Sequence, residues 1–413
     1  MDLLQIATAG SVDDGKSTLI GRLLYETNSL KDDQLEQIKQ KSNANGYEYL
    51  DFSLATDGLL TEREQGITID VSHLYFKTPK RRFIIADSPG HIEYTRNMVT
   101  GTSNADTTIL LLDARKGVIE QTKRHFYISQ LLGIKKIIFA INKMDLIEYD
   151  QKSFNKIKKE LKDLIFSRNA KGLSEYYIPL SALKGDNLIK KSEQMPWYEG
   201  KTLLDLIESL EVVDSHCDEN VFQIQYVIRP QREAYHDYRG FAGKVKSGTF
   251  SIGDSVVVFP SGKQTKISGI ENYGKPVQKA LQKENASFLL EDDLDISRGD
   301  SIHSLSKNLE ATKEIKATVC WMQSSEFRTD QKYLLQFGAQ RSLSKVNDIY
   351  EKIDISKGNS KPTSSLELND IGTASFRLAD SILKTPYKKN KNLGSFIIID
   401  IKNNNTAGVG FIQ

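Results

Sequence analysis

Near the amino terminus stand Gly10-Ser11-Val12-Asp13-Asp14-Gly15-Lys16-Ser17, followed directly by Thr18. The stretch from Gly10 to Ser17 fits the pattern G-x-x-x-x-G-K-[ST], a loop whose backbone N–H groups surround phosphates. A strand-like run, Leu3–Ala9, precedes it and a helical pattern, Ser17–Tyr25, follows it, which is the context that the motif requires. Lys16 is therefore predicted to reach the β- and γ-phosphates of a nucleotide, and the Ser17 hydroxyl to ligate Mg²⁺.

The rest of the first half alternates short apolar runs with helical patterns. This alternation predicts βαβ units around a mostly parallel sheet. The expected strands are Leu3–Ala9, Phe83–Ala86, Thr108–Asp113, Lys136–Ile141 and Tyr177–Leu180. The expected helices are Ser17–Tyr25, Gln121–Leu132, Phe154–Phe166 and Leu203–Leu210. These elements predict an α/β P-loop domain over residues 1–211.

The sequence pattern changes after residue 211. Short β-branched runs broken by turn residues replace the helical periods, as is typical of antiparallel barrels. Residues 212–220 are expected to form a linker, and Lys307–Thr312 a second one. We therefore expect two small antiparallel β-barrel domains, over residues 221–306 and 313–413. The last of these assignments depends on strand-like composition, because no motif marks it.

Two further segments predict groups around the γ-phosphate and its metal ion. One is Asp87-Ser88-Pro89-Gly90-His91, which follows an expected strand. Asp87 is placed to hold Mg²⁺ through a water, and the Gly90 N–H to sense the phosphate. Thr68, at the end of a charged loop, is expected to complete the Mg²⁺ shell, as in switch loops that order on the γ-phosphate. His91 is predicted to orient the attacking water, although a histidine after a turn is also a common surface residue.

A third pair of segments predicts which base is bound. The first is Asn142-Lys143-Met144-Asp145, after the expected strand Lys136–Ile141. The Asp145 carboxylate can accept hydrogen bonds from N1–H and N2–H₂ of guanine, whereas adenine has no donor at these positions, so such a site discriminates strongly. The second is Ser181-Ala182-Leu183, whose backbone is expected to contact guanine O6. The order of all these segments along the chain is the order that a GTPase requires.

Composition excludes several other classes of protein. The formal net charge is +2 over 413 residues, which argues against a broadly basic nucleic-acid-binding protein. Cys217 and Cys320 are the only cysteines, so neither a disulfide framework nor a structural zinc site is expected. The sequence shows no signal peptide and no apolar stretch long enough to span a membrane. We therefore expect a cytoplasmic protein with no membrane contact.

Together the motifs resemble the translation-factor branch of GTPases, the group that includes elongation factor Tu. Within this branch, the chain is most similar to the large, regulatory subunit of the bacterial heterodimeric sulfate adenylyltransferase. The stretches that carry the likeness are Gly10–Leu24, Asp57–Leu59, Asp113–Gly117, Pro179–Asn187, Pro196–Gly200 and Tyr238–Gly243. The similarity is dense up to about residue 260 and weaker in the last hundred residues.

This resemblance implies a function. The family couples GTP hydrolysis to the formation of adenosine 5′-phosphosulfate and pyrophosphate from ATP and sulfate, and a small partner subunit carries out the adenylyl transfer. It implies GTP and Mg²⁺ as cofactors, Lys16, Thr68 and His91 as catalytic residues, and a heterodimer or a higher assembly with the small subunit. No second phosphate loop follows residue 211, so a fused adenylylsulfate kinase domain is not expected.

The alternative is a translation-factor-like GTPase that carries aminoacyl-tRNA. Elongation factors usually have histidine at the position of Asp14, which argues against this role. The lysine-rich stretch Lys384–Lys391 could contact RNA, but a solvated loop between strands is the favoured interpretation. A nucleic-acid partner is therefore not expected.

Overall fold

A computed structural model describes residues 2–44, 50–55, 71–88, 95–168, 170, 172–212, 219–230, 238–305, 309–329, 331–354 and 359–413. The described residues up to 212 form one compact unit, and those from 219 onward form a second. Within the described residues, no helix has both the length and the apolar composition needed to cross a bilayer.

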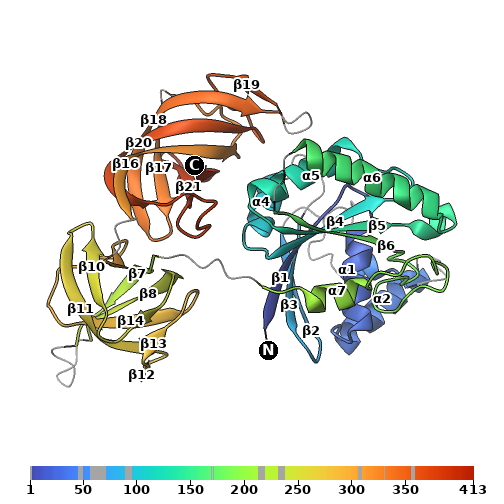
Figure 1. The fold of residues 1–413 in the computed structure, drawn as a ribbon, viewed down its shortest axis with the longest axis horizontal. Helices are drawn as coiled ribbons and strands as arrows, with labels where there is room; N and C mark the ends of the chain where they lie inside the picture. Colours follow the sequence, from blue (N-terminus) through green and yellow to red (C-terminus); the bar gives the residue numbers. More distant parts are fainter. Residues whose placement is uncertain are drawn as a thin grey trace. The chain divides into compact units, whose positions relative to one another are not determined.

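The first unit is built on a six-stranded sheet in the order β2-β3-β1-β4-β5-β6 (Figure 1). Its strands are β1 (Leu3–Ala9), β2 (Ser72–Lys77), β3 (Arg82–Asp87), β4 (Thr107–Asp113), β5 (Lys136–Asn142) and β6 (Ser174–Pro179). All pairings are parallel except β2 with β3, which form an antiparallel hairpin. The prediction of a mostly parallel sheet is confirmed.

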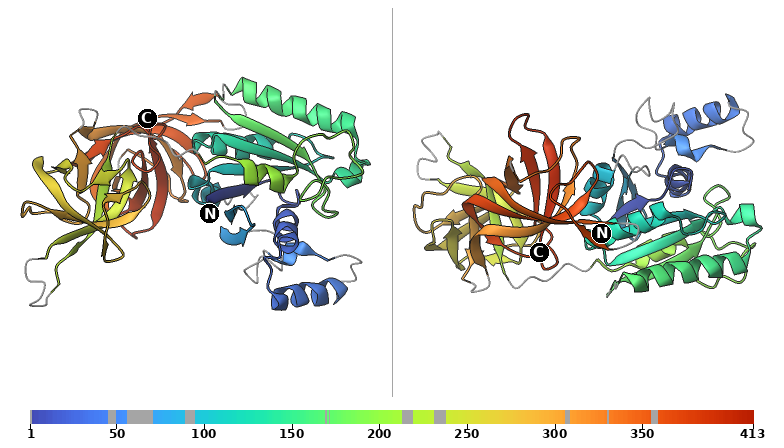
Figure 2. Two further views of the ribbon diagram at one scale, coloured as in Figure 1. Left: turned by 60° about the horizontal axis from the view of Figure 1, so that its bottom comes forward. Right: turned by 90° about the horizontal axis from the view of Figure 1, so that it is seen from above.

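Helices cover both faces of this sheet. They are α1 (Lys16–Glu26), α2 (Asp32–Ala44), α4 (Thr95–Ser103), α5 (Glu120–Leu131), α6 (Gln151–Ser167) and α7 (Leu203–Ser209), with 3-10 turns η1 (Phe52–Ala55) and η3 (Met144–Ile147). Apolar residues of α1 and α7 pack into one core with those of the strands. Helices α4, α5 and α6 lie on the opposite face (Figure 1), and Figure 2 shows α6 extending along the sheet.

Two expectations about this unit need correction. Strand β6 begins at Ser174 rather than Tyr177, because Ser174 and Glu175 pair with Lys136 and Ile137 although they are polar. At the edge of a sheet, a strand can expose polar side chains and keep its ladder on one side. Helix α2 was not predicted, because it has few apolar positions to mark its period: only Ile38 and Ser42 are buried.

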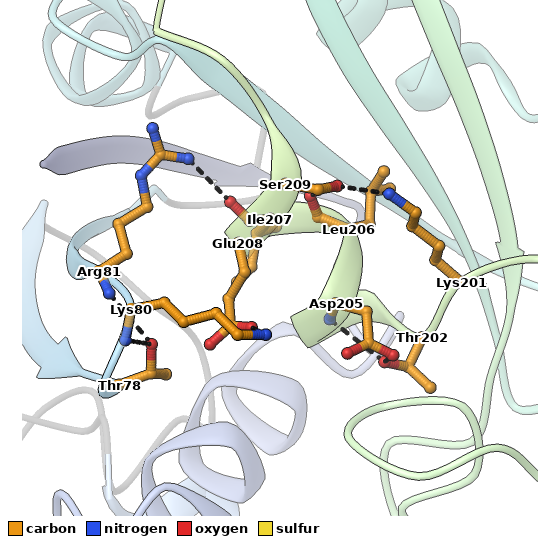
Figure 3. Close-up of polar contacts among 10 residues, drawn as sticks. All are labelled: Thr78, Lys80, Arg81, Lys201, Thr202, Asp205, Leu206, Ile207, Glu208 and Ser209. Atoms are coloured by element: carbon orange, nitrogen blue, oxygen red, sulfur yellow. Dashed lines mark hydrogen bonds and ion pairs between the residues drawn. The ribbon is translucent and has the colours of Figure 1, made fainter.

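A buried arginine fastens the last helix of the unit to the β2–β3 hairpin (Figure 3). Arg81 is only 5% exposed, and its guanidinium donates to the carbonyl oxygens of Ile207 and Leu210 at the carboxyl end of α7. It also pairs with Asp2, while the neighbouring Lys80 pairs with Glu208 at 2.7 Å. A cation at this position satisfies carbonyl groups that lack partners at the end of a helix. The end of α7 is thereby held against the sheet.

The second unit contains two closed antiparallel barrels. In the first, the ring is β10-β15-β7-β8-β14-β11, closed by pairing of β10 with β11. Its strands are β7 (Val221–Ile228), β8 (Gly240–Ser247), β10 (Ser255–Phe259), β11 (Lys263–Asn272), β14 (Asn285–Leu290) and β15 (Ser301–Ser304). The short strands β9 (Phe250–Ser251), β12 (Lys275–Pro276) and β13 (Lys279–Ala280) lie in the same part of the chain.

The second ring is β17-β21-β22-β16-β20-β18, closed by pairing of β17 with β18. Its strands are β16 (Glu310–Trp321), β17 (Lys332–Phe337), β18 (Gln340–Ile353), β20 (Ile371–Lys384), β21 (Ser395–Asp400) and β22 (Thr406–Ile412), and β19 (Ser360–Pro362) extends it. Each barrel has its own apolar core. The fold class predicted from sequence is therefore confirmed. The expected linker Lys307–Thr312 was too long, because Glu310 to Thr312 already pair with β20. The exact division of the chain into three domains stays a prediction.

Candidate nucleotide site

The carboxyl ends of the parallel strands bring the predicted segments to one edge of the first sheet. The phosphate-loop motif follows β1, Asp87 ends β3, Asn142 ends β5, and Ser181 comes shortly after β6. The ends of neighbouring strands are in register: Thr8 of β1 pairs with Asp87 of β3, and Asp113 of β4 pairs with Asn142 of β5. This edge is where open α/β sheets bind their ligands.

The loop itself has the backbone shape that its sequence predicts. Gly15 precedes α1 with a φ of 90°, and Asp13 also has a positive φ, 67°. A side chain at Gly15 would be strained at this φ, and its Cβ would stand 2.5 Å from the Asn142 Nδ2 atom. Glycine therefore lets the loop approach the end of β5 and turn directly into the helix. Among the described residues, no side chain caps the start of α1, which leaves its first N–H groups available to an anion.

Lys16 is a buried cation without an internal partner. It is the first residue of α1 and is 7% exposed, yet no ion pair or hydrogen bond from the described residues reaches its ammonium group. A buried charge is costly unless it is paired. An anion bound at the amino end of α1 would supply the missing charge. The half-buried Ser17 and Thr18 follow it on the same helix.

The charge of Lys16 also affects the pKa of a histidine that no sequence motif marks. His125, on α5, is 2% exposed. Burial, together with the positive charges of Lys16 and Arg124, lowers the pKa of His125 to about 3. His125 is therefore neutral at physiological pH and adds no positive charge beside Lys16.

Asp14 stabilises the loop from within. Its Oδ2 accepts a hydrogen bond from the Ser11 N–H at 2.7 Å, and the Asp14 N–H donates to the Ser11 carbonyl at 3.2 Å. The side chain is 2% exposed, and burial raises its pKa, although the Ser11 N–H acts in the opposite direction. Asp14 is therefore turned into the loop and does not face solvent. Gly10 lies close to β4, since a Cβ at this position would stand 3.1 Å from the Leu111 Cβ. Val12 is half-buried.

Asp87 is held at the end of β3 by a neighbouring strand. It is 1% exposed, and its Oδ1 accepts a hydrogen bond from the Thr8 hydroxyl at 3.0 Å. Ser88 is fully buried, and its hydroxyl has no partner among the described residues. The predicted residues Pro89, Gly90, His91 and Thr68 lie outside the described part of the chain.

Asn142 connects the phosphate loop to the segments expected to bind the base. Its Nδ2 donates to the Asp14 carbonyl at 2.8 Å, and its Oδ1 accepts from the Ala182 N–H at 2.9 Å. The side chain is 2% exposed. One amide therefore fixes two loops relative to each other, as the pairing of its donor and acceptor requires.

Lys143 and Asp113 form a second connection. The Lys143 ammonium donates to the Asp13 carbonyl and lies 3.2 Å from the Asp113 carboxylate. Burial acts to raise the pKa of Asp113, but hydrogen bonds from Arg115 and Lys143 outweigh it and lower the pKa to about 2. Asp113 is thus a fixed anion that orients Lys143. The sequence reading noted Asp113 only as part of a family pattern; its place at the end of β4, beside Asn142, was the available signal.

The residues predicted to recognise the base lie on two loops beyond β5 and β6. Met144 is buried and its N–H donates to the Leu180 carbonyl at 3.2 Å. Asp145 is half-buried, and no hydrogen bond from the described residues reaches its carboxylate. Ser181 is fully buried, and its hydroxyl accepts from the Lys184 N–H at 3.2 Å. The structure therefore brings Asp145 and the Ser181–Leu183 loop to one end of the site and the phosphate loop to the other.

Comparison with known proteins agrees with this geometry. Residues 1–217 match the family described as the elongation factor Tu GTP binding domain, and residues 314–413 match the GTP-eEF1A C-terminal domain-like family. This chain is a member of the elongation factor Tu type of GTPases. The first match spans more than half of the chain and includes every residue of the candidate site.

Curated relatives narrow the family further. The sulfate adenylyltransferase subunit 1 of Colwellia psychrerythraea is 43% identical over 100% of this chain and 88% of its own length. That of Bacteroides fragilis is 42% identical over 100% of this chain and 86% of its own length. The bifunctional enzyme CysN/CysC of Mycobacterium tuberculosis is 44% identical over 99% of this chain and 67% of its own length. The chain belongs to the sulfate adenylyltransferase subunit 1 family.

Among solved structures, that of Sup35 complexed with GMPPNP matches 100% of this chain and 93% of its own. The TM-score is 0.45 and the sequence identity is 19%.

Proposed function

We propose that this chain is the GTP-hydrolysing, regulatory subunit of a sulfate adenylyltransferase. In this role it couples GTP hydrolysis to the formation of adenosine 5′-phosphosulfate and pyrophosphate from ATP and sulfate, while a small partner subunit carries out the adenylyl transfer. The observation that carries the proposal is a site with phosphate-binding and guanine-type segments at one sheet edge, in a chain 41–43% identical to relatives of that name.

The residues at the site suit GTP and Mg²⁺. The amino end of α1 and Lys16, which no described residue pairs with, place positive charge where the phosphates would bind. Ser17 and the buried Asp87 would hold Mg²⁺, the latter through a water, together with Thr68. When bound, Mg²⁺ neutralises charge that develops on the phosphate oxygens.

The chain's own residues have separate tasks in this mechanism. Asp14 and Asn142 keep the phosphate loop in its binding shape. Asp145 and the backbone of Ser181–Leu183 select guanine, and His91 orients the attacking water. GTP hydrolysis can be coupled to the reaction on the partner subunit only if the GTP-bound and GDP-bound forms differ in their free energy of binding to that subunit.

A small subunit from the same source should co-purify with this chain. We expect a stable complex on size exclusion when the two are co-expressed, and GTP turnover that rises when the small subunit, ATP and sulfate are all present. The control is the same mixture without sulfate. If no complex forms and the rate of GTP turnover does not change when the small subunit is added, the chain has a different partner.

The names of the relatives do not favour delivery of aminoacyl-tRNA. Residues 314–413 match a type of domain that elongation factors also contain. This match describes the fold of the domain and is no evidence that the chain binds aminoacyl-tRNA.

A further inference from the structure

Helix α1 carries an arginine that no part of the proposed mechanism uses. Arg22 lies between Gly21 and Leu23, on the helix that the phosphate loop begins. Its Nη1 donates to the Leu183 carbonyl at 2.9 Å, and its Nη2 to the Lys184 carbonyl at 3.4 Å. Leu183 is the last residue of the Ser181–Leu183 loop, whose backbone is expected to contact guanine O6, and Lys184 follows it directly. The Arg22 side chain of α1 therefore holds the end of the Ser181–Leu183 loop by hydrogen bonds to backbone carbonyl groups.

The guanidinium is itself fixed from two further directions. Its Nε donates to the Glu26 carboxylate at 2.5 Å, one turn along the helix. Its plane lies over the ring of Phe52, with the Arg22 Cζ 5.1 Å from the ring centroid. An arginine bound through its fork and its face has little freedom left, and a lysine could not reproduce this set of contacts.

Two glycines make room for this arrangement. Gly185 has a φ of +86°, and a Cβ there would lie 2.7 Å from the Arg22 Nη2 and 2.9 Å from the Glu26 Oε1. Gly21 lets Phe52 approach α1, because a Cβ at residue 21 would overlap the Phe52 carbonyl. Tyr25 then contacts the Phe52 ring at a centroid distance of 5.0 Å. The local sequence thus supports a built contact rather than a chance surface pair.

We propose that Arg22 is a positioning residue for guanine recognition, which holds the Ser181–Leu183 loop so that its backbone can contact O6 of the base. This inference rests on the proposed function, because it takes guanine as the base bound. Arg22 touches no part of the nucleotide. It acts through the loop, whose other support is the Asn142 amide that accepts the Ala182 N–H.

The test is a binding cycle on the full chain with three diphosphates. GDP keeps every predicted base contact. In 6-thio-GDP, sulfur replaces O6 and is a weaker acceptor for hydrogen bonds from the backbone of the Ser181–Leu183 loop. IDP keeps O6 but lacks the 2-amino group that Asp145 is expected to bind. Affinities are measured by calorimetry for the unmodified chain, Arg22→Met and Arg22→Lys, with the exposed Arg82→Met as the matched control.

Arg22→Met is expected to weaken GDP binding by about tenfold, the effect of one misplaced hydrogen bond. The penalty for replacing O6 by sulfur should shrink at least threefold in Arg22→Met, because coupled contacts are not additive. The penalty for removing the 2-amino group should stay the same, since Asp145 is on another loop. Arg22→Lys should behave in the same direction, and Arg82→Met like the unmodified chain.

Equal losses for all three diphosphates in both Arg22 variants would overturn the proposal and make Arg22 a general support of the fold. Thermal unfolding of each variant checks that it is folded. If Arg22→Met does not fold, Arg22→Lys decides by the same ratio. An unmodified chain that binds ADP as well as GDP would instead contradict the proposed function, so the two failures are distinguishable.

Discussion

Replacing Lys16 by alanine is expected to weaken GTP and GDP binding on the order of 100- to 1,000-fold. The ammonium is buried at the start of α1 and has no partner in the described part of the chain, so we expect the ligand to supply its counter-charge. Truncating one member of a buried, hydrogen-bonded charge pair costs 2–5 kcal/mol or more, which corresponds to this loss. Fluorescence titration with a labelled GDP measures it.

The same substitution should leave the nucleotide-free protein at least as stable as before. A buried, unpaired charge disfavours the folded state, and alanine at this position removes it. Lys156→Ala, at an exposed position of α6, is the matched control and should bind nucleotide normally. Unchanged GTP affinity in Lys16→Ala would mean that the phosphate loop is misassigned.

Asp145→Asn is expected to change which base is bound. An amide cannot accept both N1–H and N2–H₂ of guanine, whereas it can donate to the 2-oxo group of xanthine. GTP affinity should fall on the order of 100-fold or more, because a site built to pair a polar group rejects a mismatched one strongly. The affinity for xanthosine triphosphate should rise, and competition between the two triphosphates measures the switch.

Glu148→Gln provides the control for this variant. Glu148 is an exposed carboxylate three positions beyond Asp145, so the same neutralisation there should leave guanine preference intact. If Asp145→Asn keeps the original preference, another group recognises the base, and the assignment of this segment is wrong.

The sequence predicted the elements of the site that depend on local pattern. A strand, a glycine-rich loop and a helix place Lys16 at the start of α1 whatever the rest of the chain does. The parallel sheet followed from alternation, and it brings Asp87, Asn142 and Ser181 to one edge because parallel strands end on the same side. These inferences need no knowledge of tertiary contacts.

Contacts between distant residues could not be predicted in the same way. Arg22 and Leu183 are separated by 161 positions, and nothing in the local pattern around either one marks the pair. The same holds for Arg81 and the end of α7. Helix α2 was missed for another reason: its side chains are largely exposed, so hydrophobic periodicity carries little signal there. The first residues of β6 were missed because Ser174 and Glu175 are polar and none of the first three residues is fully buried.

The coupling of GTP hydrolysis to sulfate activation is the central claim, and one measurement tests it directly. Purified complex of this chain with the small subunit of its own source is given ATP and labelled sulfate, with GTP, with GDP or with a non-hydrolysable GTP analogue. We predict that, of the three additions, only GTP makes adenosine 5′-phosphosulfate accumulate well beyond the equilibrium level reached from ATP and sulfate without it. The amount formed should rise in proportion to the GTP hydrolysed. Accumulation that is equal under all three conditions would contradict the account.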